Sequence, residues 1–163
     1  MNQAYLLIGG NLGEKWKNLE VARTKLNAKA GKIVSFSGIY KTAAWGKTDQ
    51  PPFLNQALKL ETWLSPKDLL KAINDIEREM GRERLEKFGP RLIDIDILFY
   101  NDEIVAIPEL RIPHPELQNR RFVLVPLADI ASDYIHPVLK KNVSDLLENC
   151  PDRLDVHPAE PGN

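Results

Sequence analysis

The stretch GPRLIDIDILFY, residues 89–100, joins a turn signal to the composition of a buried strand. Gly-Pro marks a turn, and the apolar, β-branched run that follows is typical of a strand inside a sheet. Two carboxylates interrupt this run, at Asp94 and Asp96. Because strand side chains alternate between faces and each residue advances about 3.3 Å, both aspartates point to one face, about 6.6 Å apart. The opposite, core-facing side then carries Ile93, Ile95 and Ile97.

Two like charges on a partly desolvated surface repel each other, so a positive group is expected between Asp94 and Asp96. Mg²⁺ fits this place, since it typically binds one or two protein carboxylates together with substrate phosphates. Arg91 precedes the strand and is placed to reach a phosphate that the same ion holds. The alternative is a solvated edge strand whose aspartates only prevent aggregation. The spacing Asp-x-Asp does not decide between the two.

A basic segment leads into this strand and favours the first interpretation. Residues 78–91 contain four Arg and one Lys against three Glu. A mixed charge run is by itself most often a solvated face. Here it ends at the paired aspartates, and arginines beside an acidic metal site are the combination that phosphoryl transfer requires.

The composition indicates one globular domain. The chain has 163 residues, 43% hydrophobic and 28% charged, with a formal net charge of −1. This balance does not indicate a general nucleic-acid surface, and no apolar run approaches the roughly 20 residues of a membrane helix. The N-terminus lacks the features of a signal peptide, so we expect a cytoplasmic protein. The single cysteine, Cys150, excludes an internal disulfide and is interpreted as a packing residue.

Hydrophobic periodicity gives a coarse order of elements. We expect strands at 4–8, 33–40, 53–63 and 93–100, and helices at 14–30, 66–80, 122–131 and 143–150, with a hairpin element after residue 101. Ser65 is the expected N-cap of the helix at 66–80, and Pro66 occupies its first helical position. This order predicts an α+β fold with a ferredoxin-like βαββαβ core and additional C-terminal elements. We expect one domain over residues 1–150 and a frayed tail over 151–163.

Several positions suggest ligand contacts, each with a plain alternative. The glycine-rich turn at 9–13 either binds phosphate or is only a turn. Trp45, in a long connection, is either a lid or a packing anchor. Phe53 and Asn55 share one strand face, which suits a flat heterocycle, although a core Phe beside a surface Asn is commoner. His114 stands between two prolines, either as a rigid donor to phosphate or as a surface histidine.

With these residues in view, the sequence resembles the 6-hydroxymethyl-7,8-dihydropterin pyrophosphokinases of folate synthesis, from the N-terminus to about Asp133. The most specific match is Gly89-Pro90-Arg91-x-x-Asp94-Ile95-Asp96-Ile97. The supporting matches, in chain order, are residues 8–13 (IGGNLG), Tyr40-x-Thr42, residues 49–55 (DQPPFLN), Glu77 with Gly81-Arg82, Pro113-His114 and Asn119-Arg120-x-Phe122.

The resemblance implies transfer of a pyrophosphoryl group from ATP to the pterin hydroxymethyl oxygen, leaving AMP. It implies two Mg²⁺ ions on Asp94 and Asp96, with Arg82 and Arg91 as further catalytic residues. It assigns ATP binding to Glu77, Arg84, Ile97, His114 and Arg120, and pterin binding to Thr42, Ala43, Trp45, Phe53, Asn55 and Phe122.

This chain departs from the family pattern at four places: Gly10 for a usual Ser, Ala43-Ala44 for Pro-Pro, Phe88 for a frequent Trp and Pro115 for a frequent aromatic residue. Two rival functions remain, a nucleotidyltransferase with paired aspartates and a ferredoxin-like module that binds a ligand without catalysis. We expect a monomer that acts on small molecules and binds neither nucleic acid nor membrane.

Overall fold

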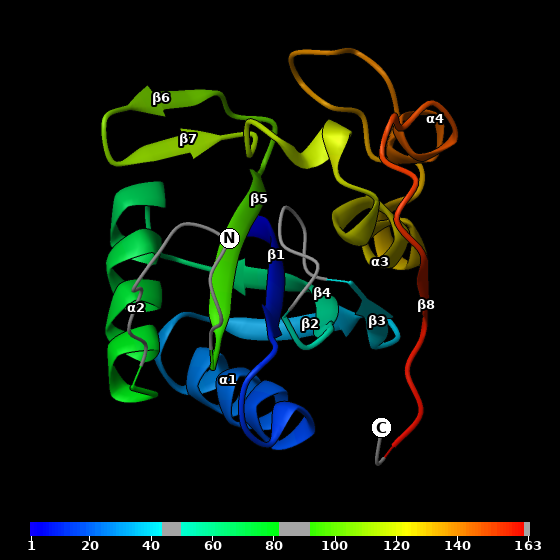
Figure 1. The fold of residues 1–163 in the computed structure, drawn as a ribbon. Helices are drawn as coiled ribbons and strands as arrows, with labels where there is room; N and C mark the ends of the chain where they lie inside the picture. The colour runs from blue at the N-terminus through cyan, green and yellow to red at the C-terminus, as the bar shows by residue number, and fades with distance from the viewer. Residues whose placement is uncertain (44–49, 82–91, 162–163) are drawn as a thin grey trace.

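The strand with the paired aspartates, β5 (Asp94–Tyr100), lies at the edge of a six-stranded antiparallel sheet (Figure 1). The computed structural model describes residues 1–43, 50–81 and 92–161. Strand order within this described part is β5-β1-β4-β3-β8, and β2 also pairs with β4. The other elements are β1 (Asn2–Gly10), α1 (Lys15–Lys29), β2 (Lys32–Phe36), β3 (Tyr40–Thr42), β4 (Phe53–Thr62), α2 (Pro66–Glu79), β6 (Val105–Ile107), β7 (Leu110–Ile112), η1 (Leu117–Asn119), α3 (Arg121–Ala131), α4 (Val143–Glu148) and β8 (Val156–Pro158).

The sheet is built from two interleaved β-α-β units. Both β1 and β2 run antiparallel to β4, so α1 connects two parallel strands with β4 between them. Both β4 and β5 run antiparallel to β1, so α2 connects a second such pair. This split arrangement is that of a ferredoxin-like fold, and the predicted α+β class is confirmed.

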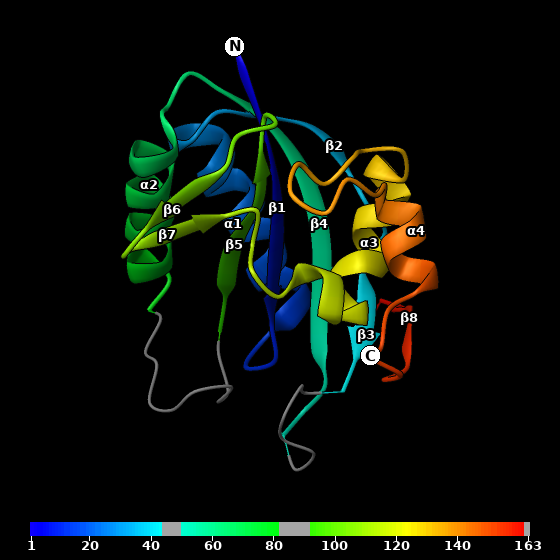
Figure 2. The same ribbon diagram turned by 90° about the horizontal axis from the view of Figure 1, so that it is seen from above.

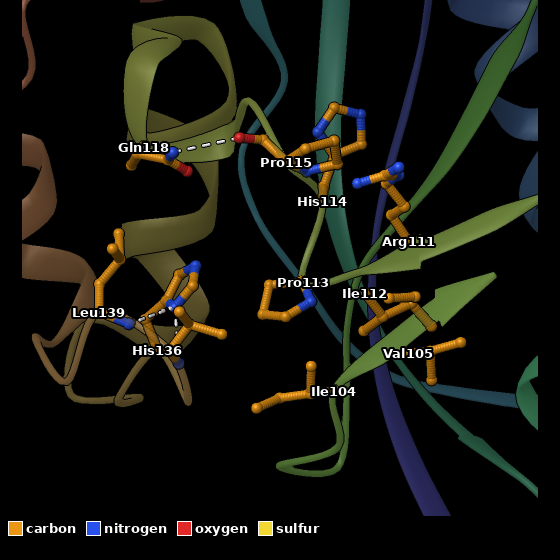
Figure 3. Close-up of a pocket in the computed structure, with 12 residues that line it drawn as sticks. Ile104, Val105, Arg111, Ile112, Pro113, His114, Pro115, Gln118, His136 and Leu139 are labelled. Carbon is orange, nitrogen blue, oxygen red and sulfur yellow. Dashed lines mark hydrogen bonds between the residues drawn. The ribbon is translucent and has the colours of Figure 1, made fainter. Parts of the chain in front are cut away.

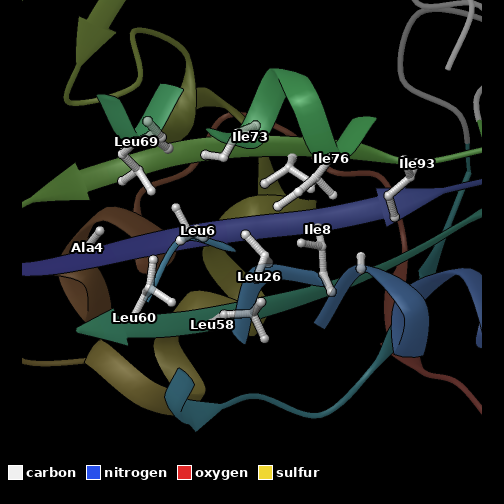
Figure 4. Packing of buried hydrophobic residues seen from close by; sticks show 14 of the residues in the cluster. Ala4, Leu6, Ile8, Leu26, Leu58, Leu60, Leu69, Ile73, Ile76 and Ile93 are labelled. Carbon is white, nitrogen blue, oxygen red and sulfur yellow. The ribbon is translucent and has the colours of Figure 1, made fainter. Parts of the chain in front are cut away.

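Helices α1 and α2 cover one face of the sheet and bury the first hydrophobic core (Figures 1 and 4). Ile93, which directly precedes β5, and the β5 residues Ile95 and Ile97 belong to this core as predicted, with exposures of 0%, 5% and 5%. Ile73 and Ile76 of α2 pack into the same cluster, near β5 (Figure 4). Alternation therefore directs the neighbouring aspartates to the other face.

Helices α3 and α4 lie on that other face, beside a second core (Figures 1 and 2). Leu7 of β1 and Leu98 of β5 pack there, together with Phe99 and the buried, unpaired Cys150. The role of this cysteine in packing is confirmed. Asp94 and Asp96 thus point to the side of the sheet that α3 occupies, beyond the edge of this core. No helix in the described ranges is both long and apolar enough to cross a membrane.

The strand expected over residues 33–40 is wrong as a single element. The structure has β2 and β3 there, because Ser37 interrupts the pairing with β4. The Ser37 N–H donates to the Ala57 carbonyl, the Ser37 hydroxyl accepts from the Ala57 N–H at 2.9 Å, and the Gln56 amide donates to the Ser37 carbonyl at 2.9 Å. The two bonds that involve side chains stand where ladder bonds would otherwise form, and the regular pairing of β2 with β4 ends at Phe36.

The frayed tail expected after residue 150 is wrong for residues 156–158. They form β8, which pairs with β3 in antiparallel register. The Thr42 hydroxyl donates to the Asp155 carbonyl at 3.0 Å, and the Ala159 N–H donates to the Ile39 carbonyl. The backbone groups at the outer side of β3 bind this segment, which the prolines alone do not predict.

Candidate active site

One row of residues crosses four neighbouring strands. Tyr40 on β3 lies opposite Asn55 on β4, Asn55 opposite Gly9 on β1, and Gly9 opposite Asp94 on β5. Residues directly opposite each other project to the same face, and adjacent strands are about 4.8 Å apart. The row therefore brings Asn55 and Asp94 to one face, with their backbones about 10 Å apart. In the next such row Asp96 lies opposite Leu7.

Gly9 makes room for the Asn55 side chain. A Cβ atom at position 9 would lie 2.0 Å from Asn55 Oδ1 and 2.8 Å from the Leu54 carbonyl oxygen. The Asn55 amide thus occupies the space that any larger residue at position 9 would take, and Asn55 is 4% exposed. Glycine inside a strand often marks such a close approach. The sequence suggested a strand ending at Ile8, whereas β1 continues through Gly10, so the function of Gly9 was missed.

Asp94 and Asp96 alternate with buried isoleucines and are themselves only partly exposed. Their shared face, predicted from the sequence, is confirmed by the register with Gly9 and Leu7. Within the described ranges no group of three or more His, Cys, Asp or Glu side chains is arranged to hold a metal. Two carboxylates supply hard oxygen ligands but not a full shell, which fits a cation that also binds substrate phosphates.

His114 is held in one orientation beside β5. The backbone N–H of His114 donates to the Leu98 carbonyl at 3.0 Å, and the ring nitrogen Nδ1 accepts the Glu116 backbone N–H at 3.2 Å. Burial, aided by the Arg120 charge and opposed by Asp94, lowers the pKa of His114 to about 4. At neutral pH the ring is therefore uncharged and carries its proton on Nε2. Of the two interpretations of this residue, the rigid hydrogen-bond donor fits this environment.

Glu77 lies on α2 and contacts β5 rather than solvent. It is 5% exposed, and its Oε2 accepts the Ile95 N–H at 2.8 Å. Ile97, also expected at the ATP site, has its side chain in the first core. Only the backbone of Ile97 is therefore positioned to meet a ligand on the aspartate face.

The aromatic residues assigned to the pterin lie at the ends of two elements. Phe53 begins β4 opposite Thr42, on the same face as Asn55, as predicted. Phe122 lies in the first turn of α3, with the Arg120 guanidinium carbon 5.9 Å from its ring centre. Both rings are partly buried, and Ala43 is exposed. Four other predicted site residues lie outside the described ranges: Trp45, Arg82, Arg84 and Arg91.

Two side-chain contacts support the strand ends around this face. Asn11, 2% exposed, donates from Nδ2 to Gln50 Oε1 at 3.1 Å and to the Pro51 carbonyl at 3.0 Å. Asp129 of α3 accepts the Tyr40 hydroxyl at 2.7 Å, and burial together with this bond raises the pKa of Tyr40 to about 12. Asp129 was missed because nothing in a single sequence pairs α3 with β3.

A separate cavity of about 310 Å³ lies between the β6–β7 hairpin and the loop at 136–139 (Figure 3). Pro113 and Ile104 line one side of it, and His136 and Leu139 line the other. His114 lines it as well, but Asn55, Asp94 and Asp96 do not. The sheet face described above is thus a different surface from this cavity.

Comparison with known proteins agrees with this geometry. A profile of the family "7,8-dihydro-6-hydroxymethylpterin-pyrophosphokinase (HPPK)" matches residues 5–132. The 2-amino-4-hydroxy-6-hydroxymethyldihydropteridine pyrophosphokinase of Synechocystis sp. is 42% identical over 95% of this chain and 79% of its own length. The enzyme of the same name from Aquifex aeolicus is 40% identical over 89% of this chain and 90% of its own.

Longer proteins match as well. The folic acid synthesis protein FOL1 of Dictyostelium discoideum is 41% identical over 98% of this chain, which spans 24% of that protein. The crystal structure of wild-type Plasmodium falciparum HPPK-DHPS with SDX-DHP superposes with a TM-score of 0.74, at 20% identity, over 91% of this chain and 43% of that one. This structural likeness supports the fold, and the sequence matches support the family. The chain belongs to the 7,8-dihydro-6-hydroxymethylpterin-pyrophosphokinase (HPPK) family of folate synthesis.

Proposed function

We propose that this chain transfers a pyrophosphoryl group from ATP to the hydroxymethyl oxygen of 6-hydroxymethyl-7,8-dihydropterin, with Mg²⁺ as cofactor. The observation that carries the proposal is the row from Asn55 through Gly9 to Asp94. This row places the Asn55 amide, which suits the edge of a heterocycle, and the Asp94 carboxylate, which suits a cation, on one face of the sheet. Gly9 stands between them and has no side chain. A pterin bound at Asn55 would extend along the sheet toward the phosphate-binding side.

The pterin half of the site combines stacking with edge recognition. The ring would lie between Phe53 and Phe122, and the Asn55 carboxamide would pair with its donor and acceptor edge. Thr42 and Ala43 contribute through their backbones, because the Thr42 hydroxyl already donates to Asp155. By family resemblance, Trp45 completes this half of the site.

The phosphate half is formed around β5. Asp94 and Asp96 would hold Mg²⁺, which when bound neutralises the bridging phosphate oxygens and lowers the pKa of the hydroxyl. His114 would donate from Nε2–H to a phosphate oxygen, because its Nδ1 is already occupied by the Glu116 N–H. Arg120, together with Arg82, Arg84 and Arg91, would bind the triphosphate charge, as the family resemblance implies.

The chemical step needs orientation more than a protein base. The hydroxymethyl oxygen attacks the β-phosphorus of ATP, the bond from that phosphorus to the α–β bridging oxygen breaks, AMP leaves with that oxygen, and the hydroxyl proton is released to water. Holding both substrates in line contributes about 7–11 kcal/mol to lowering such a barrier. Asn55, Asp94 and Asp96 would contribute to that alignment from one face of the sheet.

The test is to incubate the protein with ATP, Mg²⁺ and 6-hydroxymethyl-7,8-dihydropterin and then separate the nucleotides. We expect AMP that appears only with the pterin and is abolished by EDTA. Free pyrophosphate with an adenylylated acceptor would instead support a nucleotidyltransferase. Pterin binding without turnover, unaffected by Mg²⁺, would support a non-catalytic binding module.

A further inference from the structure

The backbone amide between the two aspartates faces the free edge of β5. In the described part of the chain β5 pairs with a single strand, β1, so its other edge needs partners from elsewhere. Two contacts supply them. The Leu98 carbonyl accepts the His114 N–H at 3.0 Å, and the Ile95 N–H donates to Glu77 Oε2 at 2.8 Å.

The placement of Glu77 is costly for the helix that carries it. A carboxylate near a helix C-terminus opposes the helix dipole, and Glu77 stands in the last turn of α2. Burial adds a desolvation cost at 5% exposure. Since neither effect stabilises α2, the favourable contribution of this side chain comes from what it binds, and its bond to the Ile95 amide reaches the start of β5.

The position of this carboxylate is fixed by the core. Ile73 and Ile76, at 1% and 0% exposure, anchor the same part of α2 in the first cluster. Ile95 stands between Asp94 and Asp96, so the strand start is held by β1 on one edge and by a charged acceptor on the other. Charge-assisted bonds of this kind are shorter and stronger than neutral ones.

We propose that Glu77 is a positioning residue for the paired aspartates, acting through the Ile95 N–H to hold both carboxylates at the spacing that the cation requires. This inference rests on the proposed function, because it assumes a cation at Asp94 and Asp96. It gives Glu77 a role other than the nucleoside contact that the family resemblance implies. Partners of this indirect kind typically alter metal affinity by about 10- to 100-fold when removed.

The test compares Glu77→Leu, which removes the acceptor, with Glu77→Gln, which keeps an acceptor but loses the charge. Glu79→Gln is the matched control, because Glu79 lies two residues further along α2 and forms ion pairs with Lys25 and Lys29 at the surface. Mn²⁺ binding is measured by electron paramagnetic resonance with a non-hydrolysable ATP analogue. Amide exchange at Ile95 is measured by NMR without metal, and thermal unfolding is recorded for each variant.

We expect the Mn²⁺ affinity to fall in those variants in which the Ile95 amide loses its protection from hydrogen exchange. Glu77→Leu should lose that protection and bind Mn²⁺ about tenfold more weakly, while Glu77→Gln and Glu79→Gln retain both. Weak Mn²⁺ binding with full protection, or normal binding after protection is lost, overturns the proposal. If Glu77→Leu does not fold, the same criterion applies to Glu77→Ala, which also removes the acceptor of the Ile95 N–H. Wild-type protein that binds Mn²⁺ but forms no AMP would refute the proposed function without affecting this comparison.

Discussion

Replacing Gly9 with alanine tests whether the sheet row described above forms the pterin site. The new Cβ would lie 2.0 Å from Asn55 Oδ1, whereas side-chain Cβ atoms essentially never approach closer than 3.0 Å. The Asn55 amide must therefore move by about 1 Å or more, and the buried Leu54 carbonyl limits where the backbone can shift. Overpacking of this kind lowers the free energy of unfolding by about 1–3 kcal/mol.

If Asn55 binds the pterin as proposed, the displaced amide also loses its bonds to it. Unsatisfied polar groups in a buried site cost about 1–3 kcal/mol, which corresponds to pterin binding weaker by about 5- to 150-fold. Calorimetric titration with the pterin measures this loss, and urea unfolding measures the stability. Gly31→Ala is the control, because its Cβ would lie 2.2 Å from the Glu61 carbonyl oxygen, at the far end of β4. It should be destabilised similarly and bind pterin normally.

A double-mutant cycle makes the reasoning refutable. Asn55→Ala removes the atom with which the new side chain collides, so Gly9→Ala should destabilise the protein less in that background. Asn55→Ala alone should reproduce the loss of pterin binding. Normal pterin affinity in a folded Gly9→Ala protein, or equal destabilisation with and without Asn55, would refute the assigned place of Asn55.

Three further predictions concern the same face. Asp94→Asn or Asp96→Asn should nearly abolish AMP formation while pterin affinity, measured by calorimetry, is retained; near-normal turnover would contradict the cation site. The pKa of His114 is about 4 in the folded protein, against an ordinary value of 6.5. Between pH 4 and pH 6.5 the unfolded chain therefore binds one proton more than the folded protein. The free energy of unfolding should rise by about 3 kcal/mol from pH 4 to pH 6.5. Urea unfolding of a His114→Asn variant should lack this contribution, and pH profiles parallel to the wild type would disprove it. Phe122→Ala should weaken pterin binding by about 3- to 10-fold through lost stacking, while Phe36→Ala, at an exposed position on β2, should leave calorimetric affinity unchanged.

The fold was predictable wherever local periodicity and burial agree. The alternation of Ile93, Ile95 and Ile97 with two aspartates predicted both the strand and the faces of its side chains. The capping serine at position 65 likewise marked the start of α2, where its hydroxyl accepts the Asp68 N–H. These signals lie within a few residues of one another, so a single sequence contains them.

What the sequence did not predict depends on contacts between distant segments. The register that sets Gly9 beside Asn55 depends on strand pairing, which one sequence does not specify. The break at Ser37 arises from its bonds to Ala57, and β8 forms because β3 offers it an edge. In the same way, the residues indicated a cation and phosphates, whereas the pterin and ATP assignments came from family resemblance.

The most direct test of the proposed reaction follows each phosphorus of ATP separately. ATP labelled at the α, β or γ position is incubated with the protein, Mg²⁺ and 6-hydroxymethyl-7,8-dihydropterin, and the pterin product is isolated. If the two groups move together, the β and γ labels enter the product in equal amounts and the α label remains in AMP. Recovery of the γ label alone, or of the α label on the pterin, would contradict pyrophosphoryl transfer.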